Sequence, residues 1–215
     1  ADYVDFKWTL KDFKDYLIHQ VEKRGIEVRH NTEATPEMIA AENFDRVIAA
    51  TGSVTALPPI KGIDNKIVVT GFDTMMDAVE VGQNVVVIGG GEVGVEAGMH
   101  MAKTGRNVTV LEMREKLAAD TTIMHFRSMF KEYWESIPTF HSKCGVTVTE
   151  ITDEGVRYLD ADGSEQFIAA DTVAISTGMK SRRDEALAFY GTTSHFYMIG
   201  DCKKPATIST AMREA

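Results

Sequence analysis

The chain has 215 residues, of which 44% are apolar and 26% charged, the composition of a globular protein with room for one large or two small domains. Its formal net charge of −9 argues against nucleic acids and anionic membrane surfaces as partners, because both favour basic patches. No apolar run approaches the ~20 residues that span a bilayer, and no signal peptide is visible, so we expect a reducing, cytoplasmic setting.

The first third of the chain predicts alternating helices and strands. Residues 9–24 place apolar side chains at helical spacing, and Thr9 with Asp12 resembles a capping box. Thr35 and Pro36 are typical of the N-cap and first position of a second helix. The remaining segments predict short strands at 26–30 and 66–70, a buried strand at 45–51, an extended crossover at 53–62, and helices at 36–42 and 73–81.

Residues 85–113 predict a strand, a glycine turn, a helix and a second strand. Gly89, Gly91 and Gly94 occupy the three glycine positions of G-x-G-x-x-G after a continuous apolar run. The first glycine permits the tight turn, the second lets a pyrophosphate approach the backbone, and the third lets the helix pack closely. The helix N-terminus would offer N–H groups to the phosphates. We therefore predict a dinucleotide at Gly89, Gly90, Gly91, Glu92, Val93 and Gly94; the alternative is a glycine-rich turn without a ligand.

An acidic residue follows at the distance that such a turn requires. Glu112 ends the second strand, 23 positions after Gly89, where a carboxylate can accept hydrogen bonds from an adenosine ribose. Because a carboxylate repels a 2′-phosphate, the pattern favours NADH over NADPH. Met113 belongs to the same predicted binding segment. Arg114 could reach a phosphate, which keeps NADPH open, and a solvated carboxylate at the strand end is the alternative for Glu112.

The second half of the chain predicts a helix at 122–136 and then mostly strands. Short strands at 146–149, 155–159 and 165–169 with acidic turns suggest an antiparallel meander. The segments at 45–52 and 171–178 are alike, each a buried strand that ends in Thr-Gly, so we place ligand contacts and a domain crossing at Thr177 and Gly178. Hinges at Gly52 and Gly178 would make 71–178 a nucleotide-binding domain inserted between two parts of another, 1–70 and 179–215. We also expect a strand at 171–176, a loop that becomes helical at 179–188, a strand at 196–199 and a helix from 208.

Three segments together carry a family resemblance: Ala50-Thr51-Gly52, the GGGEVGVEA turn, and the closing IGDCKKPATISTAMREA. The chain resembles, over nearly its whole length, the C-terminal part of the multidomain NADH:flavin oxidoreductases related to 2,4-dienoyl-CoA reductase, 2-enoate reductase and trimethylamine dehydrogenase. The resemblance implies an α/β fold, a Rossmann-like doubly wound parallel sheet with the three-stranded meander, of the flavoprotein type that has two dinucleotide-binding domains.

The resemblance also implies a longer polypeptide. An N-terminal barrel would carry FMN and a [4Fe–4S] cluster, and the C-terminal part would pass electrons from NAD(P)H through FAD. We expect Glu96 in the first turn of the helix after the glycines. By resemblance it faces the nicotinamide, whereas an acid in the first turn is also favourable through the helix dipole alone. Gly200 and Asp201 would contact FAD. The family's first glycine fingerprint would precede residue 1, so we expect a fragment that binds a nucleotide but lacks turnover alone.

The remaining reactive residues predict no further chemistry. Cys144 and Cys202 form no C-x-x-C pair, which excludes a dithiol centre and an iron–sulfur site built from this chain alone. No histidine pair has ligand spacing, so no metal site is predicted, and hydride transfer needs no catalytic side chain. Two hypotheses remain: an electron-input module that binds NADH for a flavin oxidoreductase, or an NADH-binding domain that senses without turnover.

Overall fold

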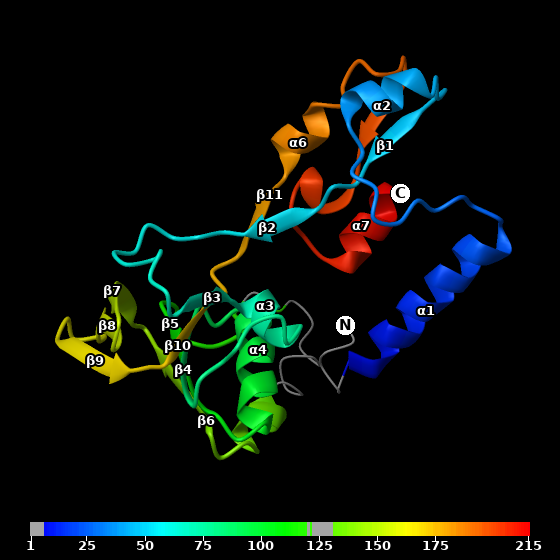
Figure 1. Cartoon of the computed structure of the whole chain (residues 1–215). Coiled ribbons are helices and arrows are strands. Elements are labelled where there is room, and N and C mark those ends of the chain that lie inside the picture. Colours follow the sequence, from blue (N-terminus) through cyan, green and yellow to red (C-terminus); the bar gives the residue numbers. More distant parts are fainter. Residues whose placement is uncertain (1–6, 120, 122–130) are drawn as a thin grey trace. The chain divides into compact units, whose positions relative to one another are not determined.

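The computed structural model describes residues 7–119, 121 and 131–215 (Figure 1). The chain divides into two compact units, each of which is described by itself. Unit 1 comprises residues 1–14 and 55–178, and unit 2 comprises residues 15–54 and 179–215. Among the described helices, none is both long and apolar enough to cross a lipid bilayer.

Unit 1 is built on a five-stranded parallel sheet, which confirms the predicted α/β fold with a Rossmann-like parallel sheet. Its strand order is β3-β10-β4-β5-β6, with β3 at Val68–Thr70, β10 at Thr172–Ile175, β4 at Asn84–Ile88, β5 at Asn107–Glu112 and β6 at Phe140–Cys144. Helix α3 (Gly71–Met75) follows β3, and α4 (Glu92–Lys103) connects β4 to β5. Strand β6 was not predicted, because His141, Ser142 and Lys143 interrupt any apolar run in this strand.

Both faces of this sheet are covered, which is why β4 is apolar at consecutive positions. Val85 and Val87 pack with α4 in one apolar cluster, and Val86 and Ile88 pack with the meander in another. Figure 1 shows α4 and the meander on opposite sides of the sheet. Each fully buried valine contributes about 1.5–2 kcal/mol to stability, so the two layers hold the strand rigidly beneath the glycine turn.

The predicted antiparallel meander is confirmed. It consists of β7 (Thr147–Thr152), β8 (Gly155–Leu159) and β9 (Glu165–Ala169), paired in that order. Of the predicted helix at 122–136, residues 122–130 lie outside the described residues, whereas residues 131–135 are helical. Trp134 of this helix stacks on Phe140 with ring centroids 6.4 Å apart.

The boundary between the units lies earlier in the chain than the predicted domain boundary after residue 70. Strand β3 pairs with β10 inside the sheet of unit 1, with Val68 opposite Val173. Residues 55–70 therefore belong to unit 1, because the crossover that contains Pro58 and Pro59 ends in a strand of that sheet.

Unit 2 contains smaller elements. They are most of α1 (Trp8–Lys23), α2 (Pro36–Ala41), β1 (Val47–Ala49), β2 (Ser53–Thr55), β11 (Met179–Ser181), α6 (Arg183–Leu187), β12 (Phe196–Met198), the 3₁₀ helix η2 (Gly200–Cys202) and α7 (Ile208–Glu214). Strand β1 pairs in parallel with β12, and β2 pairs with β11. The N-cap at Thr35 is confirmed, since its hydroxyl accepts from the Met38 N–H at 3.2 Å.

Several expectations for the segments outside the parallel sheet are wrong. Helix α1 begins at Trp8, so Thr9 lies inside the helix and does not cap it. No strand forms at 26–30, all of which is described. The segment predicted as an extended crossover is extended at its start, where it forms the short strand β2. Strand β1 is only partly buried: Ala49 is 6% exposed, but Ile48 is 60% exposed, because among the described residues β1 pairs only with β12.

Candidate functional site

The glycine turn lies at the carboxyl edge of the parallel sheet of unit 1, directly after β4. Gly89 has a φ of +102°, and a Cβ there would lie 2.5 Å from the carbonyl oxygen of Ser176. Its N–H donates to the Leu111 carbonyl at 2.9 Å. Only glycine fits this position without strain, because both the backbone conformation and the neighbouring strand end exclude a side chain.

The two other glycines of the motif differ in their surroundings. A Cβ at Gly94 would lie 1.8 Å from the carbonyl oxygen of Gly89, so the helix packs on the turn without room for a methyl group. Gly91 is the N-cap of α4, and a Cβ there would have no atom within 4 Å. The backbone at Gly91 is thus open on the side where a phosphate would approach, and the residues present fit a dinucleotide.

Glu112 turns its carboxylate back onto the glycine turn. Its Oε2 accepts from the Gly90 N–H at 2.5 Å, and its Oε1 accepts from the Arg114 N–H at 2.8 Å. The residue is 7% exposed, so a freely solvated strand-end carboxylate is excluded. A carboxylate has about four acceptor positions, and the structure shows one hydrogen bond to each oxygen.

The loop after β5 closes over the same turn, a feature that the motif did not predict. The Ala118 N–H donates to the Gly90 carbonyl at 2.7 Å, and Leu117 packs against Gly90. Ala118 is fully buried with a φ of +49°, a conformation that costs about 1 kcal/mol or more for a residue with a side chain. Met113 is 75% exposed at the start of this loop, where an apolar ligand surface can contact it.

Glu96 lies in the second turn of α4, since the helix begins at Glu92, and it is 7% exposed. Its carboxylate pairs with the ammonium of Lys7, a partner that no sequence pattern indicates. Burial raises the pKa of the Glu96 carboxyl above its ordinary value, and the Lys7 ammonium acts in the opposite direction. The helix dipole acts mainly within the first turn, so it does not explain this position.

Thr177 and Gly178 lie beside the end of β10 and hold the segment that enters unit 1. The Thr177 hydroxyl donates to the Ala56 carbonyl at 2.7 Å, and the Gly178 carbonyl accepts from the Ala56 N–H at 2.9 Å. Gly178 has a φ of +111°. Both residues, which the sequence predicts as ligand contacts, therefore hydrogen-bond to the backbone of Ala56.

Gly200 and Asp201 form a separate group in unit 2. The Asp201 carboxylate accepts from the Ser53 hydroxyl at 2.9 Å and from the Ala206 N–H at 3.2 Å. The Gly200 N–H donates to Glu214 at 2.9 Å. These contacts fix the turn before α7 within unit 2.

Neither cysteine forms a disulfide in the described structure. Both Cys144 and Cys202 are free, and they belong to different units. Burial and the nearby Glu112 carboxylate raise the pKa of the Cys144 thiol, which disfavours the reactive thiolate. The buried Cys202 thiol donates to the Ala49 carbonyl at 3.3 Å.

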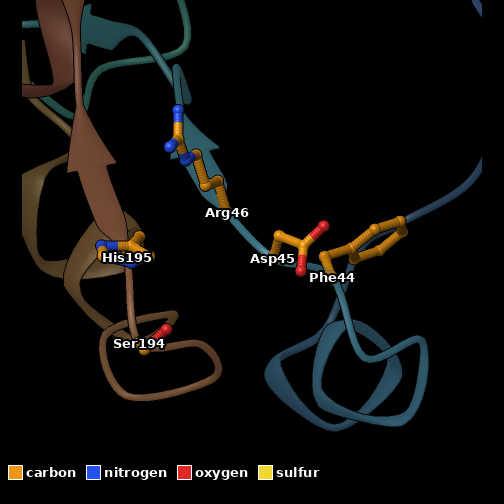
Figure 2. Close-up of a pocket in the computed structure, with 5 residues that line it drawn as sticks. All are labelled: Phe44, Asp45, Arg46, Ser194 and His195. Carbon is orange, nitrogen blue, oxygen red and sulfur yellow. The ribbon is translucent and has the colours of Figure 1, made fainter.

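A surface pocket in unit 2 is lined by none of the predicted site residues. Phe44, Asp45 and Arg46 line it from the segment before β1, and Ser194 and His195 line it from the segment before β12 (Figure 2). These residues stand at the amino ends of two parallel strands. Ligands of open parallel sheets bind at the carboxyl ends, so we do not assign the cofactor to this pocket.

Comparison with known proteins gives several similar chains. The metal reductase of Desulforamulus reducens is 28% identical over 95% of this chain and 36% of its own length. The NADH oxidase of Thermoanaerobacter brockii is 35% identical over 80% of this chain and 27% of its own length. The solved structure of a 2-naphthoyl-CoA reductase with 2-naphthoyl-CoA superposes with a TM-score of 0.94 and 32% identity, over 99% of this chain and 32% of that one.

The chain thus spans between 27% and 36% of the length of these proteins. The family model described as pyridine nucleotide-disulphide oxidoreductase matches residues 40–215. This match covers the glycine turn, Glu112 and the segment around Asp201, and it implies a redox domain that binds FAD and NAD(P)H. The chain belongs to the pyridine nucleotide-disulphide oxidoreductase family.

Proposed function

We propose that the chain binds NADH at the glycine turn and serves as the electron-input part of a longer flavin-dependent oxidoreductase. One observation carries this proposal: the open backbone at Gly91 and the Glu112 carboxylate lie at the same carboxyl edge of the sheet. A pyrophosphate needs the first feature and an adenosine ribose needs the second.

The phosphate-binding part is the beginning of α4. The helix has 12 residues, and its N-cap, Gly91, has no side chain to bond the first N–H groups. These groups and the positive end of the helix dipole favour an anion. A side chain at Gly91 would occupy the space through which the phosphates approach.

The ribose-binding part favours NADH over NADPH. The acceptor positions of Glu112 suit the two ribose hydroxyls of NADH, whereas a 2′-phosphate would meet a second negative charge. The Arg114 side chain is exposed, and its backbone N–H donates to the Glu112 carboxylate at 2.8 Å, which holds this acceptor in place. This arrangement supports the choice of NADH.

Bound NADH supplies a hydride, which carries one proton and two electrons, and FAD is the acceptor that the proposal assigns to unit 2 near Gly200 and Asp201. The residues of the chain bind and orient the cofactor; no side chain is assigned a proton transfer. We further propose that an N-terminal barrel of the same polypeptide, with FMN and a [4Fe–4S] cluster, receives the electrons. The chain matches about a third of its relatives' length, which supports the proposal that the barrel lies in another part of a longer polypeptide.

Glu112→Ala is expected to weaken NADH binding about 5- to 150-fold, because a buried hydrogen-bonding group worth about 1–3 kcal/mol is lost. Calorimetric titration measures this change. Glu115→Ala is the matched control, since Glu115 is an exposed acid on the same loop and its loss changes the net charge equally. NADH affinity that is equal in Glu112→Ala and the unaltered chain would contradict the proposal.

A further inference from the structure

Gly90, which the glycine motif leaves unspecified, contacts the ligand-binding carboxylate directly. Its N–H donates to Glu112 Oε2 at 2.5 Å, and its carbonyl accepts from the Ala118 N–H at 2.7 Å. Both backbone polar groups of Gly90 are therefore occupied by the strand end and loop that carry the predicted ribose contact.

The space beside Gly90 is filled by the same segment. A Cβ at position 90 would lie 2.5 Å from Leu117 Cδ2 and 2.9 Å from Glu112 Cβ. Gly90 is not among the glycines with positive φ. Glycine is thus required here for space and not for backbone conformation, which distinguishes Gly90 from Gly89.

The Glu112 carboxylate is held from its other side as well. Its Oε1 accepts from the Arg114 N–H at 2.8 Å, so backbone groups fix both oxygens. The loop then returns through the buried Ala118 to the Gly90 carbonyl. We call this arrangement of Gly90, Glu112, Arg114, Leu117 and Ala118 the carboxylate brace.

We propose that Gly90 is a positioning residue that sets the choice between NADH and NADPH by fixing Glu112 through the carboxylate brace. This inference rests on the proposed function, because it takes the ribose of the dinucleotide to lie at Glu112. A hydrogen bond to a ribose hydroxyl requires an acceptor at about 2.7–3 Å, and repulsion of a 2′-phosphate weakens with distance. A displaced carboxylate therefore loses both effects.

The test is Gly90→Ala, with dissociation constants for NADH and NADPH measured by calorimetry and folding checked by thermal denaturation. The ratio of the NADPH to the NADH dissociation constant is expected to fall at least about 10-fold toward the ratio of Glu112→Ala. A purely structural effect would weaken both affinities equally and leave the ratio unchanged, which would overturn the inference.

A second variant keeps the inference testable if Gly90→Ala does not fold. In the double variant Gly90→Ala with Leu117→Ala, the side chain nearest to the added methyl group is removed. Its ratio of the NADPH to the NADH dissociation constant is expected to lie between that of Leu117→Ala alone and that of Gly90→Ala. If Gly90→Ala does not fold, Glu112→Ala gives the second limit. A double variant with the same ratio as Leu117→Ala alone would overturn the inference. If Glu112→Ala leaves NADH affinity unchanged, the proposed function itself is contradicted and the inference falls with it.

Discussion

Gly94→Ala is expected to destabilise unit 1 by about 3 kcal/mol or more, at the upper end of the cost of overpacking. The added methyl group would lie 1.8 Å from the carbonyl oxygen of Gly89 and 3.2 Å from Ser176 Cβ. The nearest atom belongs to the backbone of the glycine turn, so no flexible side chain can move aside. Urea denaturation followed by circular dichroism measures this loss.

Gly91→Ala is the matched control for that experiment. It adds the same methyl group to the same motif, where no atom lies within 4 Å. Its stability is expected to change by about 1 kcal/mol at most, since Ala is a poorer N-cap than Gly. Equal destabilisation by the two substitutions would show that the close contact of α4 with the turn is not what requires Gly94.

Gly91→Ala is also expected to weaken NADH binding about 100-fold. The methyl group occupies the open side of the turn and displaces the pyrophosphate from the N–H groups of α4. A 100-fold change in the dissociation constant corresponds to about 3 kcal/mol of binding free energy. NADPH should lose affinity by the same factor, because the substitution acts on the phosphates that both cofactors share.

Calorimetric titration of the folded variant checks this prediction. The unaltered chain and Gly91→Ala are compared at the same protein concentration with both cofactors. An unchanged dissociation constant in Gly91→Ala would mean that the phosphates do not lie at the turn, whatever the stability of the variant.

The parallel sheet and its glycine turn could be predicted because their signals are local. A continuous apolar run before Gly89 predicts a strand buried on both faces, and the spacing to Glu112 predicts a carboxylate at the turn. The helix between the two strands could be predicted from the glycines that stand at its beginning and its end. These features depend on residues within thirty positions of one another, so the sequence contains the required information.

The partners of the site residues could not be predicted, because they depend on contacts distant in sequence. Lys7 meets Glu96 from 89 positions away, and Ser53 meets Asp201 from 148 positions away. The position of Gly90 within the carboxylate brace depends on the conformation of the loop after β5, including the positive φ of Ala118. An alanine carries no sequence signal for that conformation.

Unit 2 was predicted less well, for a related physical reason. Apolar runs at 45–51 predict a buried strand, but burial requires neighbouring layers, and Ile48 remains exposed on β1. The strand predicted at 26–30 forms no ladder in the described structure, because propensity alone does not supply a partner strand.

Hydrogen–deuterium exchange of the chain with and without saturating NADH shows whether the cofactor binds at the glycine turn. The amides at residues 89–94 and 112–118, where the turn and the loop of the carboxylate brace meet, are expected to exchange more slowly with NADH. Unchanged exchange in both segments, or slowing confined to the pocket at residues 44–46 and 194–195, would mean that NADH does not bind at the turn.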